Sequence, residues 1–281
     1  MASKAIEPPS RTGTQSIERA ARVLRVLAER GRSGWRISDL AARTGLALGT
    51  CHRILEGLVR ERMAIHIASN ARYAVGPLIA ELAASRPDWV DLPGEMASQL
   101  QQLARRYRVV SFLYARSGND FVCLARQNGI EMLALAVQRG TRRPLATSAG
   151  GAAILMRLPA DERREVIRAN LADLKDFSRE RITRIRAMLR ESAEHSASAG
   201  YPFGLNLARV VAGVHSFGVA VCDPDSSAVL GSVLMSGPPE RLPLEQIMRI
   251  LPQLQEVAGE VAERWVHARG PRGAGEGEGS Q

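Results

Sequence analysis

Residues 16–60 carry three short apolar runs at helical spacing, separated by glycines, and this pattern constrains the fold more than any other feature of the chain. The first run repeats every three or four positions and predicts a helix from Ser16 to Arg30, ended near Gly31. Its apolar positions are Ile17, Ala20, Ala21, Leu24, Leu27 and Ala28. We expect the residues before it, 1–13, to form a disordered leader.

Two more helices follow the first one closely. Ser38 is predicted as the N-cap of a short helix with Asp39 in its first turn, and Gly45 ends it. The next helix has an apolar inner face made of Cys51, Ile54, Leu55, Leu58 and Val59. Its outward positions are Thr50, His52, Arg53, Glu56 and Arg60. Two helices joined by a short glycine-containing turn predict a helix-turn-helix.

The segment MAIHIASNARYAV follows the third helix and has the pattern of a hairpin. Two short runs of strand-forming residues surround the turn-prone pair Ser69-Asn70. The hairpin would form the wing of a winged helix-turn-helix domain covering residues 14–76.

The positive charge of the chain is concentrated in this segment. The formal net charge is +9, and residues 1–75 hold 13 Lys and Arg against 6 Asp and Glu, so they carry +7 and the other 206 residues carry +2. A local excess of cations suggests a polyanion as partner, because neutralised phosphates release counterions. Nucleic acid is the first candidate, and a membrane surface is the rival.

An α-helix fits the major groove of DNA, where side chains near its N-terminus reach base edges. Arg53 can donate two hydrogen bonds to guanine. We therefore take Gly49, Thr50, His52, Arg53 and Arg72 as candidate DNA contacts. The alternative is a solvated face on which the arginines form only an ion pair with Glu56.

The rest of the chain alternates strand and helix patterns. Residues 76–108 are mostly helical, interrupted at Pro87 and Pro93, and connect to the strand-like runs VVSFLYA, FVCLARQ and EMLALAV. Helices are predicted from TSAGGAAILMRL, at 159–171, at 178–199 and at 243–267, with the strands VHSFGVAVC and AVLGSVLMS before the last one. The fold class is mixed α/β (α+β) with a central, mainly antiparallel sheet, and the glycine-rich residues 269–281 are expected to be a disordered tail.

Several function classes find no support in the sequence. No run is long and apolar enough to span a membrane, and the start lacks the apolar segment of a signal peptide, so we expect a cytoplasmic protein without a membrane partner. The three cysteines show no metal-ligand spacing, and the sequence has no nucleophile elbow, P-loop or dinucleotide motif. In a strand His215 and Ser216 would point to opposite faces. We expect no catalytic residues, no metal and no cofactor, and hence no enzyme.

The N-terminal segment resembles the winged helix-turn-helix of the IclR family of bacterial regulators. The matching stretches are QSIERAARVLRVLAE, SDLAARTGL, TCHRIL and RYAVG, and the similarity continues through GTRRPLATSAGGAAILMRLPADE, GVHSFGVAVCD and SGPPERL. The resemblance implies a linker helix over 77–92 and a GAF-like effector-binding domain over 93–268. It also implies a homodimer, or a tetramer, on double-stranded operators with inverted repeats. A spacer helix with no part in dimerisation is the alternative for the linker.

The resemblance further implies that a small organic or aromatic acid binds between the sheet and the helix that starts near Thr147. The residues it places at this effector site are Ser148, Ala149, Gly150, Asn206, Arg209, Ser216, Leu234 and Ser236. Backbone amides at such a helix start suit a carboxylate. Without the resemblance, a tight packing turn that needs small residues is the preferred interpretation of this segment.

Three positions depart from the family pattern. The family usually has an acid where this chain has Arg209, commonly Cys at Ser216, and an additional polar residue at Leu234. Arg209 would favour an anionic effector, or it points to solvent and the pocket is vestigial. The sequence therefore predicts a sequence-specific transcriptional regulator that responds to a small molecule. A non-specific architectural DNA-binding protein and a regulator with a vestigial effector pocket are the alternatives.

Overall fold

The computed structural model describes residues 14–85, 91–132, 134–174 and 177–268, and the chain divides into two compact units, 1–85 and 86–281. The predicted leader and tail lie outside the described residues, as does part of the predicted linker.

Three helices form the core of the first unit: α1 (Gln15–Ala28), α2 (Ile37–Thr44) and α3 (Leu48–Arg60). A 3-10 turn over Gly31–Ser33 follows α1. Gly45 ends α2 in the left-handed conformation with φ 70°, as the sequence predicted. The prediction of Ser38 as N-cap is wrong, because Ser38 lies inside α2, whose N-cap is Arg36, two residues earlier. The helices bury a common set of apolar residues with no exposed surface: Val23, Leu27, Leu40, Cys51 and Leu55.

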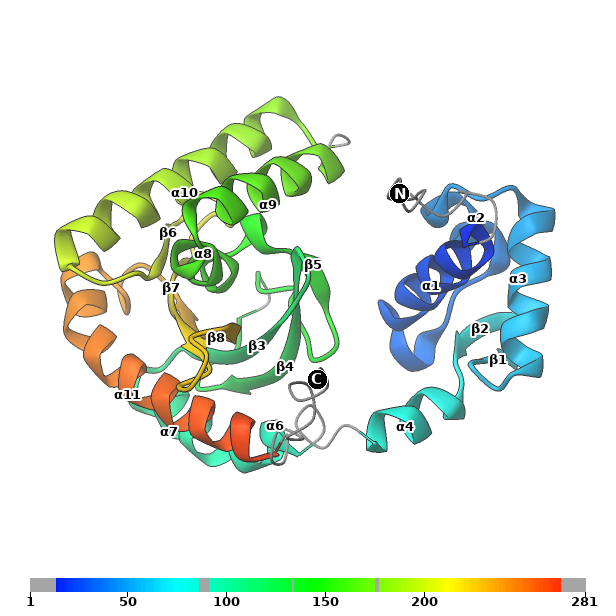
Figure 1. Ribbon diagram of the computed structural model, residues 1–281, viewed down its shortest axis with the longest axis horizontal. Coiled ribbons are helices and arrows are strands. Elements are labelled where there is room, and N and C mark those ends of the chain that lie inside the picture. Colours follow the sequence, from blue (N-terminus) through cyan, green and yellow to red (C-terminus); the bar gives the residue numbers. More distant parts are fainter. Residues whose placement is uncertain (1–13, 86–90, 133, 175–176, 269–281) are drawn as a thin grey trace, which may run out of the picture. The chain divides into compact units, whose positions relative to one another are not determined.

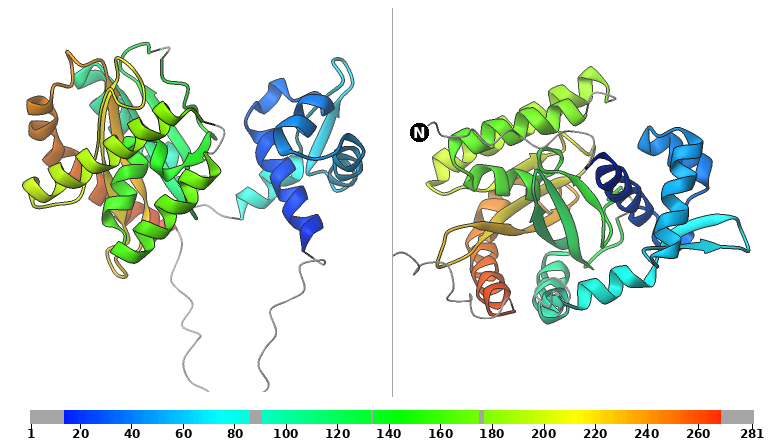
Figure 2. Two further views of the ribbon diagram at one scale, coloured as in Figure 1. Left: turned by 90° about the horizontal axis from the view of Figure 1, so that it is seen from above. Right: turned by 45° about the vertical axis from the view of Figure 1, so that its right-hand side comes forward.

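The wing is the antiparallel hairpin of β1 (Ala64–Ile67) and β2 (Arg72–Val75), which extends away from the three helices in the right-hand view of Figure 2. The strand β2 also exchanges two backbone hydrogen bonds between Tyr73 and Trp35, at 2.8 and 2.9 Å, so the wing is tied to the start of α2. The helix α4 (Pro77–Ala84) follows directly. The predicted linker helix 77–92 is therefore helical up to Ala84, and residues 86–90 are not described.

The second unit is built on a six-stranded antiparallel sheet in the order β5-β4-β3-β8-β7-β6. Its strands are β3 (Val110–Ser117), β4 (Asp120–Asn128), β5 (Arg142–Pro144), β6 (Gly204–Leu207), β7 (His215–Cys222) and β8 (Val229–Gly237). The four longer strands correspond to predicted apolar runs. The predicted strand EMLALAV is wrong, since its described residues form no strand: Leu135 and Val137 instead accept hydrogen bonds from Arg126 Nη1, at 2.8 and 2.7 Å.

Helices cover both faces of this sheet (Figure 1). One face packs against α6 (Leu92–Glu95), α7 (Ala97–Tyr107) and α11 (Leu244–Ala268). The other packs against the 3-10 turn Leu145–Thr147, α8 (Ala149–Arg157), α9 (Ala160–Asp173) and α10 (Arg179–Ala199). Pro93 does not interrupt a helix, because it lies in the first turn of α6, where its missing N–H costs nothing.

Two pairs of hydrogen bonds join α10 to the edge strand β6 and to Phe203, the residue before it. Ser192 Oγ accepts from the Leu205 amide at 2.9 Å and donates to the Leu205 carbonyl at 3.1 Å. One turn later, Ser196 Oγ does the same for Phe203, at 3.0 and 2.9 Å. A sheet edge leaves unpaired backbone groups, and these two serines pair them. The register of α10 on β6 is therefore fixed.

Candidate DNA-binding surface and effector site

The helix α3 divides into a buried face and an exposed face as its sequence predicted. Cys51, Leu55 and Leu58 are buried, whereas Gly49, His52 and Arg53 are exposed and Thr50 is half-buried. The exposed face of α3 therefore presents the four candidate residues of its first turns to solvent.

The N-terminus of α3 is open. Its N-cap is Ala47, which offers no side-chain oxygen, and the first turn holds no acidic residue. The first amides of a helix have no intrahelical acceptor and carry partial positive charge. This end of α3 is therefore suited to an external anion such as a phosphate.

The candidate side chains differ in how far they are engaged. Nδ1 of His52 lies 3.5 Å from Oε1 of Glu56, one turn further along α3. Arg53 has no hydrogen bond or ion pair with any residue that the structure describes, so its guanidinium can bind elsewhere without breaking a contact. Arg72 Nη1 donates to the carbonyl oxygens of Ser33 and Gly34, at 3.3 and 3.2 Å, and so supports the wing.

Three predicted effector residues lie in one row across the sheet of the second unit. Asn206 on β6 pairs with Ser216 on β7, and Ser216 pairs with Ser236 on β8. Cross-strand partners point to the same face of a sheet, and all three side chains are buried, with exposures of 3, 6 and 2%. The structure thus places a row of polar groups on the α8 side of the sheet.

Leu234 lies two residues before Ser236 on β8, so its side chain points to the same face of the sheet. It pairs with Phe112 on β3, and Val110 pairs with Ser236. Tyr114 follows on this face and stacks on Phe121 with ring centroids 4.2 Å apart. Reasoning from the sequence missed these aromatic neighbours of the predicted site, although the alternation in VVSFLYA places Phe112 and Tyr114 on a common face. Burial raises the pKa of Tyr114 well above its usual value.

Ser148, Ala149 and Gly150 form the start of α8. Ser148 caps the helix, since its side chain accepts from the Gly151 amide at 3.0 Å. The glycines are required by packing: a Cβ on Gly150 would lie 2.8 Å from the Tyr114 ring, and one on Gly151 would lie 1.9 Å from the Leu145 carbonyl oxygen. The expected packing turn is therefore present at the predicted effector site.

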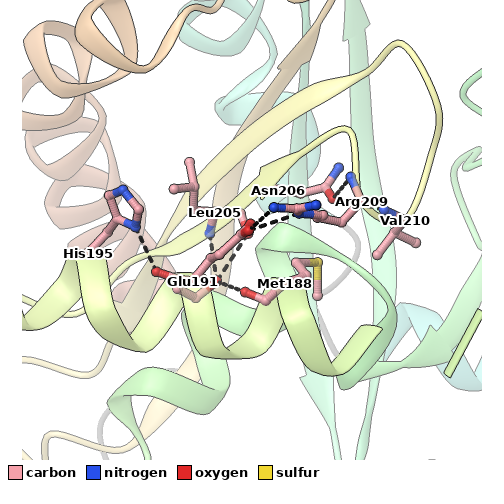
Figure 3. Close-up of polar contacts among 8 residues, drawn as sticks. Met188, Glu191, His195, Leu205, Asn206, Arg209 and Val210 are labelled. Atoms are coloured by element: carbon pink, nitrogen blue, oxygen red, sulfur yellow. Dashed lines mark hydrogen bonds and ion pairs between the residues drawn. The ribbon is translucent and has the colours of Figure 1, made fainter. Parts of the chain in front are cut away.

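Asn206 holds the loop between β6 and β7. Its Oδ1 accepts from the amides of Arg209 and Val210, at 3.1 and 3.0 Å, and its Nδ2 donates to the Val214 carbonyl at 3.2 Å. Figure 3 shows this corner, where Arg209 turns toward α10 and binds Glu191. Glu191 belongs to no predicted site. In the sequence it is one of many charged residues of α10, which is the pattern of a solvent-exposed helix.

The part of the chain that the structure describes offers no support for other kinds of site. It holds no cluster of His, Cys, Asp or Glu suited to a metal ion, and none of its helices is long and apolar enough to cross a membrane. His215 Nδ1 lies 2.8 Å from the Leu242 carbonyl oxygen, while Ser216 faces the opposite side of the sheet. The two side chains are thus not brought together.

Each of the two units matches a known protein domain family. The model of the IclR helix-turn-helix domain matches residues 16–64, and that of the C-terminal domain of IclR bacterial transcriptional regulators matches residues 88–263. The HTH-type transcriptional repressor AllR of Klebsiella pneumoniae is 26% identical over 239 residues, which cover 84% of each chain.

Solved structures share the fold. An IclR family regulator from Brucella abortus has a TM-score of 0.68 at 23% identity, covering 93% of this chain and 96% of its own. An IclR homologue from Microbacterium hydrocarbonoxydans, complexed with 4-hydroxybenzoate, has a TM-score of 0.67 at 19% identity, covering 89% of this chain and 100% of its own. Members of this family are transcriptional regulators and not enzymes. The chain, with its DNA-binding helix-turn-helix domain and its C-terminal effector domain, belongs to the IclR family of bacterial transcriptional regulators.

Proposed function

We propose that the protein is a cytoplasmic, sequence-specific regulator that binds inverted-repeat operators as a homodimer and responds to a small organic acid. The observation that carries the DNA-binding part is the open N-terminus of α3 beside the unengaged Arg53. The free amides and the positive helix end suit a phosphate, and Arg53 suits a guanine edge. Gly49, Thr50, His52 and Arg72 would complete the contact with groove and backbone.

Pairing of two chains follows from the small size of this surface. One helix contacts a few base pairs, whereas two half-sites read together roughly add their binding energies. An inverted repeat is the DNA symmetry that matches two equal subunits. This requirement supports a dimer as the DNA-binding form, and the family resemblance extends it to a tetramer.

The effector part of the proposal rests on the second unit. Asn206, Ser216 and Ser236 form a buried polar row opposite the start of α8, whose amides suit a carboxylate. Leu234 and its aromatic neighbours would surround an apolar body. The 4-hydroxybenzoate complex of the Microbacterium homologue supports this class of ligand, and Ser148, Ala149, Gly150 and Arg209 are the remaining candidate contacts.

Ligand and DNA would be coupled through two arrangements of the dimer. A ligand shifts DNA affinity only by the ratio of its affinities for these arrangements. A typical coupling of about 1–3 kcal/mol corresponds to a change of roughly 5- to 150-fold in operator affinity.

The experiment is a binding titration of the full chain on DNA upstream of its own and neighbouring genes. Excess unrelated duplex is the competitor, and each titration is repeated with saturating 4-hydroxybenzoate. We expect binding that survives the competitor and changes at least about five-fold with the acid. Binding removed equally by any duplex would indicate an architectural protein. Specific binding that saturating 4-hydroxybenzoate leaves unchanged would remove this acid as effector while leaving the DNA-binding function in place.

A further inference from the structure

Glu191 on α10 and Arg209 on the loop form an ion pair. Arg209 occupies the loop position at which the family usually has an acid. Both Nε and Nη2 of Arg209 donate to Oε1 of Glu191, at 2.8 and 2.5 Å (Figure 3). In this chain the carboxylate is therefore on α10 and its cationic partner is on the loop.

The second carboxylate oxygen of Glu191 is left without a partner. Oε2 is buried and accepts no hydrogen bond from any residue that the structure describes. A carboxylate and a guanidinium commonly form two parallel bonds that use both oxygens. Here both nitrogens of Arg209 bind the same oxygen. The side chain of Arg209 is 52% exposed, whereas that of Glu191 is only 18% exposed. A purely structural ion pair gains nothing from an unused buried acceptor.

Glu191 lies near the predicted effector row, because Arg209, which it binds, donates its own amide to Asn206 Oδ1. Ser192, the next residue of α10, is hydrogen-bonded to Leu205, and Leu205 precedes Asn206. Asn206 Oδ1 already accepts two loop amides and cannot accept from a ligand as well, so only the second N–H of Asn206 Nδ2 is left for one. Among the described side chains of this corner, the buried acceptor without a partner is Oε2 of Glu191.

We propose that Glu191 is an effector-binding residue whose Oε2 accepts a hydrogen bond from a hydroxyl group of the ligand, with Arg209 as the residue that positions it. The inference rests on the proposed function and narrows the ligand class to hydroxy acids. The carboxylate of such an acid binds at the start of α8, and its hydroxyl group reaches α10. A hydroxyl group is preferred to a second carboxylate because Oε2 needs a donor.

The test compares acids that differ only in the hydroxyl group. Dissociation constants of the full chain are measured calorimetrically for benzoate and 4-hydroxybenzoate, and for butyrate and 4-hydroxybutyrate. For at least one pair we expect the hydroxy acid to bind about ten-fold more tightly, as for a hydrogen bond to a charged acceptor. In Glu191→Gln this advantage falls to roughly three-fold or less, because a neutral acceptor makes a weaker bond, while the acid without a hydroxyl group keeps its dissociation constant.

Glu194→Gln is the matched control, because Glu194 is an exposed acid on the same helix. It should leave both dissociation constants and their ratio unchanged. Equal affinity within each pair in the wild-type protein, no binding of any of the four acids, or an equal loss for both members in Glu191→Gln would each overturn the inference. Operator binding without ligand is measured in parallel. Its presence in those cases shows that the DNA-binding function stands although the ligand assignment fails.

Discussion

Replacing Gly151 by Ala tests whether the start of α8 is fixed by contact with the preceding turn. The added Cβ would lie 1.9 Å from the carbonyl oxygen and 2.6 Å from the carbonyl carbon of Leu145, a fully buried residue. Ordinary contact begins at 3.4 Å, so backbone must move against backbone. Overpacking of this kind costs about 1–3 kcal/mol, and alanine recovers at most about 1 kcal/mol of helix propensity. We expect a net loss of about 1–2 kcal/mol in the stability of the second unit.

Gly259→Ala is the matched control, since Gly259 is an exposed helical glycine of α11, and apart from its chain neighbours and the local helix backbone no atom lies within 4 Å of the place its Cβ would take. It should gain about 0.5–1 kcal/mol from propensity alone. Urea unfolding of the full chain, followed by circular dichroism, measures both variants. With a denaturant slope of about 2 kcal/mol/M, the midpoints of the two variants differ by roughly 1 M. Equal midpoints would refute the packing argument for the start of α8.

Two further results are expected. Thiol reagents at pH 8 should label Cys222 within minutes and leave Cys51 and Cys123 unmodified in the native protein. Burial raises the pKa of the Cys51 and Cys123 thiols, to about 12 for Cys123, and the thiolate is the reactive form. Rapid labelling of Cys123, read by mass spectrometry, would contradict its burial. Gly45→Ala should lower the stability of the first unit by about 1 kcal/mol, since Gly45 has φ 70° and an L-residue is strained in that conformation; an unchanged unfolding midpoint would show that the turn between α2 and α3 can adjust.

Much of the first unit could be predicted because its signals are local. Apolar residues at helical spacing predict α1 and α3, and Gly45 and the pair Ser69-Asn70 mark the turns. The start of α2 was missed by two residues, because Ser38 resembles a cap, while the helix begins at Ile37 without a side-chain cap.

The second unit depends more on tertiary contacts. EMLALAV has the composition of a strand, but Arg126 holds its carbonyls and its apolar side chains pack over the core. The short strands β5 and β6 carry no alternation and were not predicted, since a neighbouring strand determines their pairing. Glu191 could not be identified either, because only the register of α10 on β6 brings it to Arg209.

The most direct test of the account is the specificity of DNA binding in Arg53→Ala and Arg60→Ala. The two arginines are seven residues apart, hence on the same face of α3, and both are exposed, but Arg60 is at the far end from the open N-terminus. Affinities for the operator and for an unrelated duplex are measured at one salt concentration. Arg53→Ala should reduce the ratio of operator affinity to unrelated-duplex affinity roughly 5- to 150-fold, which corresponds to about 1–3 kcal/mol. Arg60→Ala should weaken both affinities by the same factor. An unchanged ratio in Arg53→Ala would contradict the assignment of α3 as the helix that reads the operator.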